Sequence, residues 1–350
     1  MNRPSLLLIY TGGTIGMMEN AVTGALQPLD FSHMYDFVPE LRRFAFDIDV
    51  HSFEEPIDSS NVNIRTWVHL AGIIQENYSK FDGFVVLHGT DTMAYTASAL
   101  SFMLEGLSKP VIFTGAQLPM GRLRTDGREN LITALEIAAA RFDGNPAVRE
   151  VCIYFESSLF RGNRTHKYNT EDFDAFESAN YPTLANVGVH IFYNRQSLLN
   201  LSEGQMNAHL AMSDEVALFR IFPGMNESIV RNMLLSPSLK GLVLETFGSG
   251  NAPMDRWFSD ILSQIIKRGV VVVNISQCNQ GFVEQGRYQT SLQLVNAGVC
   301  SGADMTVEAA LTKLMYLIGK EYTPTEIRRL IETPLRGELT NYSVLGQLRS

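Results

Sequence analysis

The feature that most constrains the fold is the alternation of short apolar runs with longer amphipathic stretches. The apolar runs have the length of strands, and the amphipathic stretches have the spacing of helices. The runs lie at residues 5–10, 46–53, 84–89, 111–115 and 151–155, and the helical stretches lie at 63–78, 91–104 and 126–142. Strand and helix in turn predict a mostly parallel sheet with helices on both faces.

A second series of the same kind follows after a polar stretch. Residues 191–212 show no clear period and are interpreted as a connection between domains. The apolar runs of the second series lie at 216–222, 240–247 and 269–276, and further helical stretches lie at 305–319 and 323–333. The fold class is therefore α/β, with two unequal domains at 1–190 and 213–350, each a mostly parallel sheet flanked by helices.

Charge and cysteine content exclude several classes of function. The 28 basic and 37 acidic residues give a net charge of −9, so no broad basic surface is available for nucleic acid or an anionic membrane. The three cysteines have no CxxC spacing, which indicates neither a disulfide framework nor a zinc site. The first apolar run is too short for a secretory signal, and no segment has the length of a membrane span. We expect a cytoplasmic protein.

Turn residues that include many hydroxyl groups follow the predicted strands. In an open parallel sheet, ligands bind beyond the carboxyl ends of the strands, so these residues mark the expected site. They are Thr11, Gly12, Gly13 and Thr14 after the first strand, Asp58, Ser59 and Ser60 after the second, His88, Gly89, Thr90 and Asp91 after the third, and Thr114, Gly115, Ala116 and Gln117 after the fourth. If the turns converge, they form one cup of hydroxyl groups.

The first of these turns, TGGTIG, presents Thr14. It has no lysine for a phosphate-binding P-loop, and its adjacent glycines do not fit the dinucleotide fingerprint GxGxxG. Two glycines beside a hydroxyl allow close backbone approach and supply N–H groups, as an oxyanion hole around a nucleophile requires. The alternative is an ordinary tight turn after a buried strand.

The third turn and a later loop supply groups that could handle protons. Thr90 and Asp91 stand at a predicted helix start, where Asp91 could equally be an ordinary N-cap. A threonine hydroxyl needs a base to become a good nucleophile, and a lysine can serve where its surroundings favour the neutral amine. Lys167, in RGNRTHK, is the candidate, and a solvated surface lysine is the alternative.

Seven segments, in order, resemble the L-asparaginases of the bacterial cytoplasmic type I group. They are TGGTIG, PIDSSN, HGTDTMAYTASAL, TGAQLP, RGNRTHK, FGSGNAP and GADMTVEAALTKL, and the similarity runs from about residue 5 to about residue 338. The resemblance implies hydrolysis of L-asparagine to L-aspartate and ammonia through a threonine acyl-enzyme, without a metal or an organic cofactor. Thr14 matches the nucleophile of the family. Thr90, Asp91 and Lys167 match its hydrogen-bonded triad, which handles protons and the attacking water.

The same resemblance implies the substrate contacts. The backbone at Gly13 and the turn at Ala116 match the parts that face the amide. The turn of Asp58, Ser59 and Ser60 matches the grip on the α-carboxylate, and Asp91 also matches the partner of the α-ammonium. Asn251, in GSGNAP, matches an asparagine that reaches a neighbouring subunit's site, which implies a homodimer or homotetramer.

Two departures from the family pattern bear on mechanism and regulation. The loop MMENAVTGALQPLD, residues 17–30, lacks the tyrosine that usually assists the nucleophile, so another tyrosine, a water or Lys167 has to replace it. Some members bind asparagine at a separate effector site. Cys278 matches that region, but Glu245 stands where those members have an arginine, so we expect no such control.

Three other functions remain open at this point. The first is a broader glutaminase-asparaginase. The second is an amidotransferase subunit that supplies ammonia to charged tRNA, for which an extra N-terminal module and a basic face are expected and not found. The third is a nonenzymatic asparagine sensor, although a pure binder needs neither a nucleophile nor a base. Ammonia release from asparagine and glutamine separates an enzyme of narrow or broad specificity from a sensor.

Overall fold

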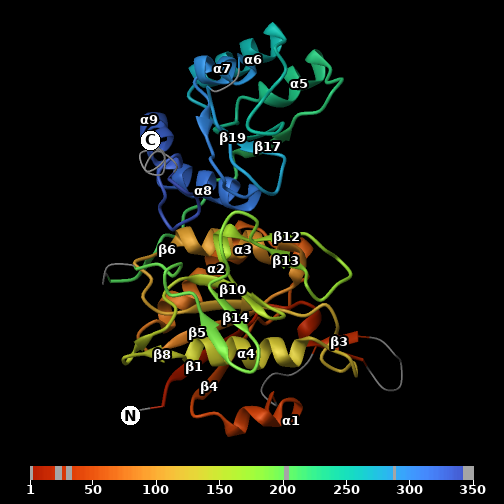
Figure 1. The fold of residues 1–350 in the computed structure, drawn as a ribbon, viewed down its shortest axis with the longest axis vertical. Helices are drawn as coiled ribbons and strands as arrows, with labels where there is room; N and C mark the ends of the chain where they lie inside the picture. Colours follow the sequence, from red (N-terminus) through yellow and green to blue (C-terminus); the bar gives the residue numbers. More distant parts are fainter. Residues whose placement is uncertain (1–2, 20–25, 29–33, 201–204, 287–288, 342–350) are drawn as a thin grey trace. The chain divides into compact units, whose positions relative to one another are not determined.

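Two α/β units make up the chain, Met1–Leu210 and Ala211–Ser350 (Figure 1). The computed structural model describes residues 3–19, 26–28, 34–200, 205–286 and 289–341. Each unit contains one principal sheet with its own helices. The predicted class, two unequal α/β domains with mostly parallel sheets, is confirmed.

The sheet of the first unit is mixed. Its strand order is β15-β14-β11-β10-β7-β5-β1-β4; the strands from β4 to β10 pair in parallel, and β11, β14 and β15 pair antiparallel. The bounds are β1 Ser5–Tyr10, β4 Asp47–Ser52, β5 Gly83–Leu87, β7 Val111–Thr114, β10 Val151–Phe155, β11 Ser158–Arg161, β14 Ala185–Val187 and β15 Ile191–Tyr193.

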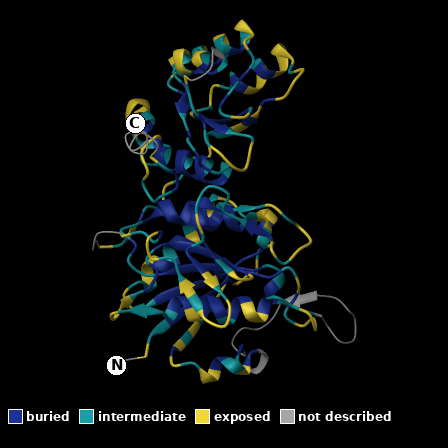
Figure 2. Cartoon of the chain, viewed as in Figure 1, coloured by how far each residue is buried: buried dark blue, intermediate teal, exposed yellow. Residues whose placement is uncertain are grey.

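The central strands are buried on both faces, as expected for parallel strands covered by helices (Figure 2). On one face, Leu6 and Leu8 of β1 pack in one cluster with Leu131 and Leu135 of α4. On the other face lie α2 and α3 (Figure 1). The helices are α1 Met34–Phe37, α2 Ile64–Asn77, α3 Met93–Met103 and α4 Gly127–Ala139.

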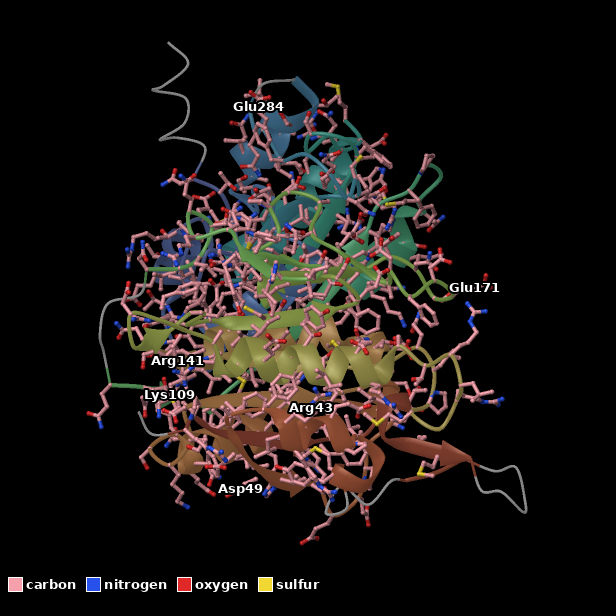
Figure 3. All side chains as sticks on the ribbon, turned by 60° about the horizontal axis from the view of Figure 1, so that its bottom comes forward. Arg43, Asp49, Lys109, Arg141, Glu171 and Glu284 are labelled. Atoms are coloured by element: carbon pink, nitrogen blue, oxygen red, sulfur yellow. The ribbon has the colours of Figure 1, made fainter. Side chains whose placement is uncertain are left out.

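Two basic side chains satisfy carbonyl groups where α2 and α4 end (Figure 3). Lys109 Nζ donates to the carbonyl oxygens of Tyr78 and Phe81, 2.5 and 2.6 Å away. Arg141 Nη1 donates to the carbonyl of Ala140, the C-cap of α4, at 2.9 Å. Cations at a helix C-terminus pair with its unsatisfied carbonyl groups and with the negative end of its dipole. These contacts fix the ends of two helices whose opposite ends lead toward the site.

The sheet of the second unit is parallel throughout, in the order β17-β18-β19-β20. Its core combines strand residues such as Leu242 and Val272 with Phe258 and Ile261 of α6. The bounds are β17 Val216–Arg220, β18 Gly241–Thr246, β19 Val271–Ser276, β20 Cys300–Ser301, α5 Glu227–Leu234, α6 Arg256–Lys267, α7 Gln289–Ala297, α8 Val307–Gly319 and α9 Pro324–Ile331.

Short elements complete the described chain. They are η1 Thr14–Gly16, η3 Pro39–Arg43, η4 Ser59–Asn61, η5 Thr90–Thr92, η6 Gly162–Arg164, β2 Met17–Glu19, β3 Leu26–Pro28, β6 Leu104–Glu105, β8 Arg141–Phe142, β9 Asn145–Pro146, β12 His166–Lys167, β13 Phe176–Glu177 and β16 Asn207–Ala208. The stretch 191–212, expected to be a connection, contributes β15 and β16 to the first unit. Strands of two or three residues are too short to show a period. No helix in the described ranges is long and apolar enough to cross a membrane.

Candidate active site

The candidate site lies at the carboxyl ends of β1, β5 and β7. In sheet order, β1 has β4 on one side and β5 on the other, so the chain leaves β1 in one direction and β5 in the opposite direction. Such a topological switch point opens a crevice beyond the strand ends. The turns that the sequence marks as rich in hydroxyl groups begin at this point.

Contacts between backbones bring the turns after β1 and β5 together. Thr11 donates from its amide and its hydroxyl to the carbonyl oxygen of Leu87, at 3.0 and 2.9 Å. Gly13 has φ +89°, and a Cβ on it would lie 2.5 Å from the amide nitrogen of Gly89. Only glycine fits this place, because a side chain would need both the disfavoured φ and the occupied space. Thr14, which begins η1, therefore follows a residue that contacts the turn of Thr90.

The turn after β4 is tied to the turn after β5 through Ser59. The carbonyl oxygen of Ser59 accepts a hydrogen bond of 2.7 Å from Thr92 Oγ1. Asp58 accepts hydrogen bonds from the amide and the hydroxyl of Ser60, at 2.9 and 2.8 Å, and these bonds lower the pKa of its carboxyl group. The carboxylate thus holds η4 in shape, with Ser59 buried and Ser60 exposed.

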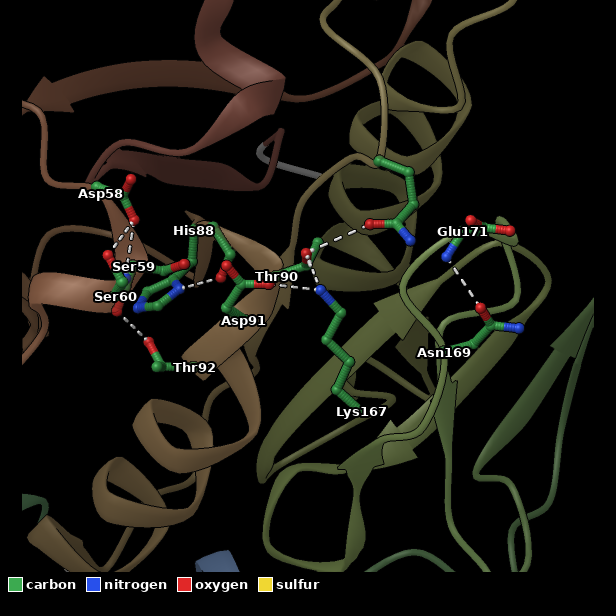
Figure 4. Close-up of polar contacts among 12 residues, drawn as sticks. Asp58, Ser59, Ser60, His88, Thr90, Asp91, Thr92, Lys167, Asn169 and Glu171 are labelled. Carbon is green, nitrogen blue, oxygen red and sulfur yellow. Dashed lines mark hydrogen bonds and ion pairs between the residues drawn. The ribbon is translucent and has the colours of Figure 1, made fainter.

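Lys167 reaches the turn after β5 from a distant part of the chain (Figure 4). It lies on β12, which pairs with β13 in a short hairpin. Its Nζ donates to Thr90 Oγ1 at 2.8 Å and to Asp91 Oδ1 at 2.7 Å. The side chain of Lys167 is 13% exposed and that of Asp91 is 66% exposed. A largely buried amino group is therefore paired with a carboxylate that remains open to solvent on its other side.

The turn after β7 is tied to Thr90 through Gln117. The hydroxyl of Thr90 donates to Gln117 Oε1 at 3.4 Å, and Gln117 Nε2 donates to the carbonyl oxygen of Asp172 at 3.0 Å. Asp126 Oδ2 accepts a hydrogen bond from the backbone N–H of Gln117 at 2.9 Å, and Asn130 Nδ2 donates to the carbonyl oxygen of Gly115 at 3.0 Å. These bonds fix the turn that contains Ala116.

Asp126 and Asn130 were not predicted from the sequence. They lie at and after the start of α4, in DGREN, where an aspartate before a helical stretch is the signal that could have located them. The links from Gln117 to Thr90 and from Thr92 to Ser59 leave no such signal, because they depend on how separate turns fold against each other.

Tyr10 and Tyr35, which pack in the same apolar cluster as Ile15 of the first turn, have other partners. The hydroxyl of Tyr10 donates to the carbonyl oxygen of Gly16 at 3.2 Å, and burial raises its pKa to about 12. Tyr35, on α1, has the Arg42 guanidinium 5.8 Å from its ring centroid. The loop expected to lack the assisting tyrosine lies partly outside the described residues, at 20–25 and 29–30.

Asn251 belongs to the second unit, where it closes the turn after β18. Its backbone N–H donates to the carbonyl oxygen of Phe247 at 2.8 Å, and its side-chain Oδ1 accepts a hydrogen bond from Thr290 Oγ1 at 2.7 Å. On the same sheet, Glu245 Oε1 lies 3.9 Å from Arg220 Nη1, across the register of β17 and β18. The described residues contain no group of three or more His, Cys, Asp or Glu side chains placed to hold a metal ion.

Two family models together match most of the chain. "Asparaginase, N-terminal" matches residues 5–199, and "Glutaminase/Asparaginase C-terminal domain" matches residues 215–331. The chain belongs to the asparaginase/glutaminase family. The family predicted from the seven segments is thus confirmed.

Individual family members cover nearly the whole chain. L-asparaginase 1 of Escherichia coli K12 is 44% identical over 97% of this chain and 99% of its own length. The crystal structure of L-asparaginase I from Vibrio cholerae superposes with a TM-score of 0.88, at 39% identity over 97% of this chain and 99% of that chain. The thermostable L-asparaginase from Thermococcus kodakarensis gives a TM-score of 0.87 at 31% identity, over 96% and 99%. The chain is therefore similar to type I members of the asparaginase/glutaminase family over 97% of its length.

Proposed function

We propose that the chain is an L-asparaginase that hydrolyses the side-chain amide of L-asparagine to L-aspartate and ammonia. The observation that carries this proposal is the pair of bonds from Lys167 Nζ to Thr90 Oγ1 and Asp91 Oδ1, 2.8 and 2.7 Å long. A lysine held against a threonine at a topological switch point can move protons for a second hydroxyl nearby. Membership of the family and its similar L-asparaginases support the same activity.

Thr14 is the proposed nucleophile. Its Oγ forms a bond to the amide carbon of the substrate, and its proton passes by way of Thr90 to Lys167. For this step Lys167 is the neutral amine, and the Thr90 hydroxyl turns from Gln117 to donate to Nζ. The carbonyl electron pair moves to oxygen, and backbone N–H groups beside Gly13 and Ala116 stabilise the oxyanion. The C–N bond then breaks, and the leaving nitrogen takes a proton from the same relay and departs as ammonia.

Water completes the cycle. It attacks the ester carbon on Thr14, gives its proton to Lys167 by way of Thr90, and forms the second tetrahedral intermediate. The bond from carbon to Thr14 Oγ breaks, and the hydroxyl regains its proton as L-aspartate leaves. Lys167 acts in both steps and so takes the role of the tyrosine that is missing from residues 17–30.

The α-ammonium and α-carboxylate groups of the substrate bind to different turns of the site. Asp91, whose carboxylate is 66% exposed, is the proposed partner of the α-ammonium group. Ser59 and Ser60 are the proposed partners of the α-carboxylate, and Asp58 keeps their turn in shape through its bonds to Ser60. The hydrogen bond from Thr92 to Ser59 supports this arrangement, because it ties the carboxylate turn to the turn of Asp91.

A homodimer or homotetramer in the cytoplasm is proposed for the whole enzyme. Asn251 would complete a neighbouring subunit's site, and its bond from Thr290 supports a fixed side-chain orientation. The three cysteines are free, and Cys278 is exposed, which fits a reducing compartment. The partner that is expected in solution is therefore a second copy of the chain together with L-asparagine. Glu245 in place of an arginine argues against a separate effector site for asparagine.

Ammonia release from L-asparagine and L-glutamine over a concentration series tests the proposal. Thr14→Ala is expected to lower kcat on asparagine by a thousandfold or more, on the order of the loss when a covalent nucleophile is removed. Thr14→Ser keeps a hydroxyl and is the matched control, which should retain measurable turnover. Comparable kcat/KM values for both amides would make the enzyme a broad glutaminase-asparaginase. An inactive parent that still binds asparagine would overturn the proposal in favour of a sensor.

A further inference from the structure

His88 is a buried titratable residue for which the proposed reaction has no use. It follows β5 directly, with 1% of its surface exposed, and it precedes the turn that carries Thr90 and Asp91. Its Nδ1 lies 2.7 Å from the carbonyl oxygen of Gly89, and its Nε2 lies 3.0 Å from Thr96 Oγ1 on α3. The ring of Phe113 contacts it edge to face, with centroids 6.0 Å apart. The imidazole therefore has contacts on three sides, and Figure 4 shows the one beside the turn of Thr90.

The partners of this ring decide where its proton sits. The carbonyl oxygen of Gly89 only accepts, so the short contact requires a proton on Nδ1. In a neutral imidazole Nε2 is then an acceptor, and the hydroxyl of Thr96 donates to it. Thr96 in turn accepts from Trp67 Nε1 at 3.1 Å, and an indole N–H can only donate. The hydrogen bonds thus form a series from Trp67 through Thr96 and His88 to Gly89, in which each donor has one acceptor. With a neutral imidazole, only one arrangement of protons fits this series.

The chain of hydrogen bonds ends on a peptide group of the site. The Gly89–Thr90 peptide is planar and trans, so its N–H points away from its C=O. Because the carbonyl of Gly89 points to His88, the amide of Thr90 points to the opposite side. Gly89 is also crowded, since a Cβ on it would lie 2.6 Å from Ser59 Oγ. The orientation of this peptide therefore affects the turns of Thr90 and Ser59 together.

We propose that His88 is a positioning residue for the asparaginase reaction. Thr96 holds it in the Nδ1–H tautomer, and in that form it fixes the Gly89–Thr90 peptide plane and thereby the place of Thr90 between Lys167 and Gln117. The inference rests on the proposed function for its catalytic consequence. The tautomer itself depends only on the contacts of the ring.

The tautomer is tested by long-range proton–nitrogen NMR on full-length protein labelled with 15N-histidine. The His88 signals are identified by their loss in His88→Asn. The expected result at neutral pH is a protonated Nδ1 and an unprotonated Nε2. A proton on Nε2, or on both nitrogens, would overturn the inference whatever the protein catalyses.

The positioning role is tested by removing one hydroxyl. Thr96→Val keeps the shape of the side chain and is expected to lower kcat for asparagine by about tenfold to a hundredfold, with KM changed less than about threefold. Thr96→Ser restores the hydroxyl and should recover most of the loss. Ser101→Ala removes a buried hydroxyl on the same helix whose hydrogen bonds, within the described part of the chain, go to helix carbonyls, so its kcat should match the parent. An unchanged kcat in folded Thr96→Val would contradict the role.

A second pair of variants covers the case in which Thr96→Val does not fold. His88→Asn retains an N–H near the position of Nδ1, whereas His88→Leu has similar bulk and no donor. The inference expects His88→Asn to keep at least about tenfold more kcat than His88→Leu; equal values would overturn it. A parent that releases no ammonia at all would instead refute the proposed function, and the NMR result would still stand by itself.

Discussion

At the scale of single residues, the sharpest prediction concerns the charge and the proton of Lys167. Lys167→Met is expected to lower kcat for asparagine by about a hundredfold or more, in the range for loss of a general base. Lys167→Arg keeps a cation beside Asp91, but a guanidinium does not give up its proton. Both variants should therefore be similarly impaired in steady-state ammonia release. Recovery of more than half the parent kcat in the arginine variant would mean that Lys167 acts by its charge alone.

Some residues of the candidate site could be predicted from the sequence more easily than others. Thr14, Thr90 and Ser59 follow predicted strands, so their place at the sheet edge could be expected from topology alone. Lys167 lies 77 positions after Thr90, in a hairpin with no apolar pattern, so only the family resemblance connected the two. The bond from Thr90 to Gln117 was not foreseen, because the orientation of one side-chain amide depends on the neighbouring turn and on Asp172.

At the scale of elements, the contact between the turns after β1 and β5 is tested by adding one methyl group. Gly13→Ala should both strain the backbone at φ +89° and drive Cβ to 2.5 Å from the Gly89 backbone. Gly144→Ala is the matched control, because its φ is +82° and nothing lies within 4 Å. The control should lower the free energy of unfolding by about 1 kcal/mol. Urea denaturation should show a larger loss for Gly13→Ala, with kcat reduced at least a hundredfold; equal losses would disprove the close contact.

The elements themselves were predictable where they are long and periodic. The stretches at 63–78, 91–104 and 126–142 contain α2, α3 and α4. The apolar runs of the first series contain β1, β4, β7 and β10 and overlap β5, which begins one residue earlier, at Gly83. The antiparallel part was missed: β14 has three residues, of which Ala185 is buried and Asn186 exposed. So short a strand owes its existence to its pairing with Leu159 and Phe192, and long-range pairing leaves no local pattern.

At the scale of the whole molecule, the distribution of the histidines predicts that acid lowers the stability of the two units to different extents. All seven lie before residue 210, so the second unit has none. Burial lowers the pKa of His88 from 6.5 to about 4. Between these values the unfolded chain binds a proton that the folded unit does not, so unfolding becomes more favourable as the pH falls. His88 alone should lower the free energy of unfolding of the first unit by about 3 kcal/mol from pH 6.5 to pH 4.

The two tryptophans allow each unit to be followed separately, since Trp67 lies in the first unit and Trp257 in the second. In Trp257→Phe, urea unfolding followed by the fluorescence of Trp67 should show the midpoint falling steadily from pH 6.5 to pH 4. Adding His88→Asn removes the titrating group and should flatten that slope. In Trp67→Phe, the fluorescence of Trp257 should show little change from pH 6.5 to about pH 5, because the carboxyl groups of Glu326 and Glu338 have pKa values lowered from 4.5 and weaken the fold only once the unfolded chain takes up their protons near that value. A slope that survives in the His88→Asn background would assign the acid sensitivity of the first unit to other groups.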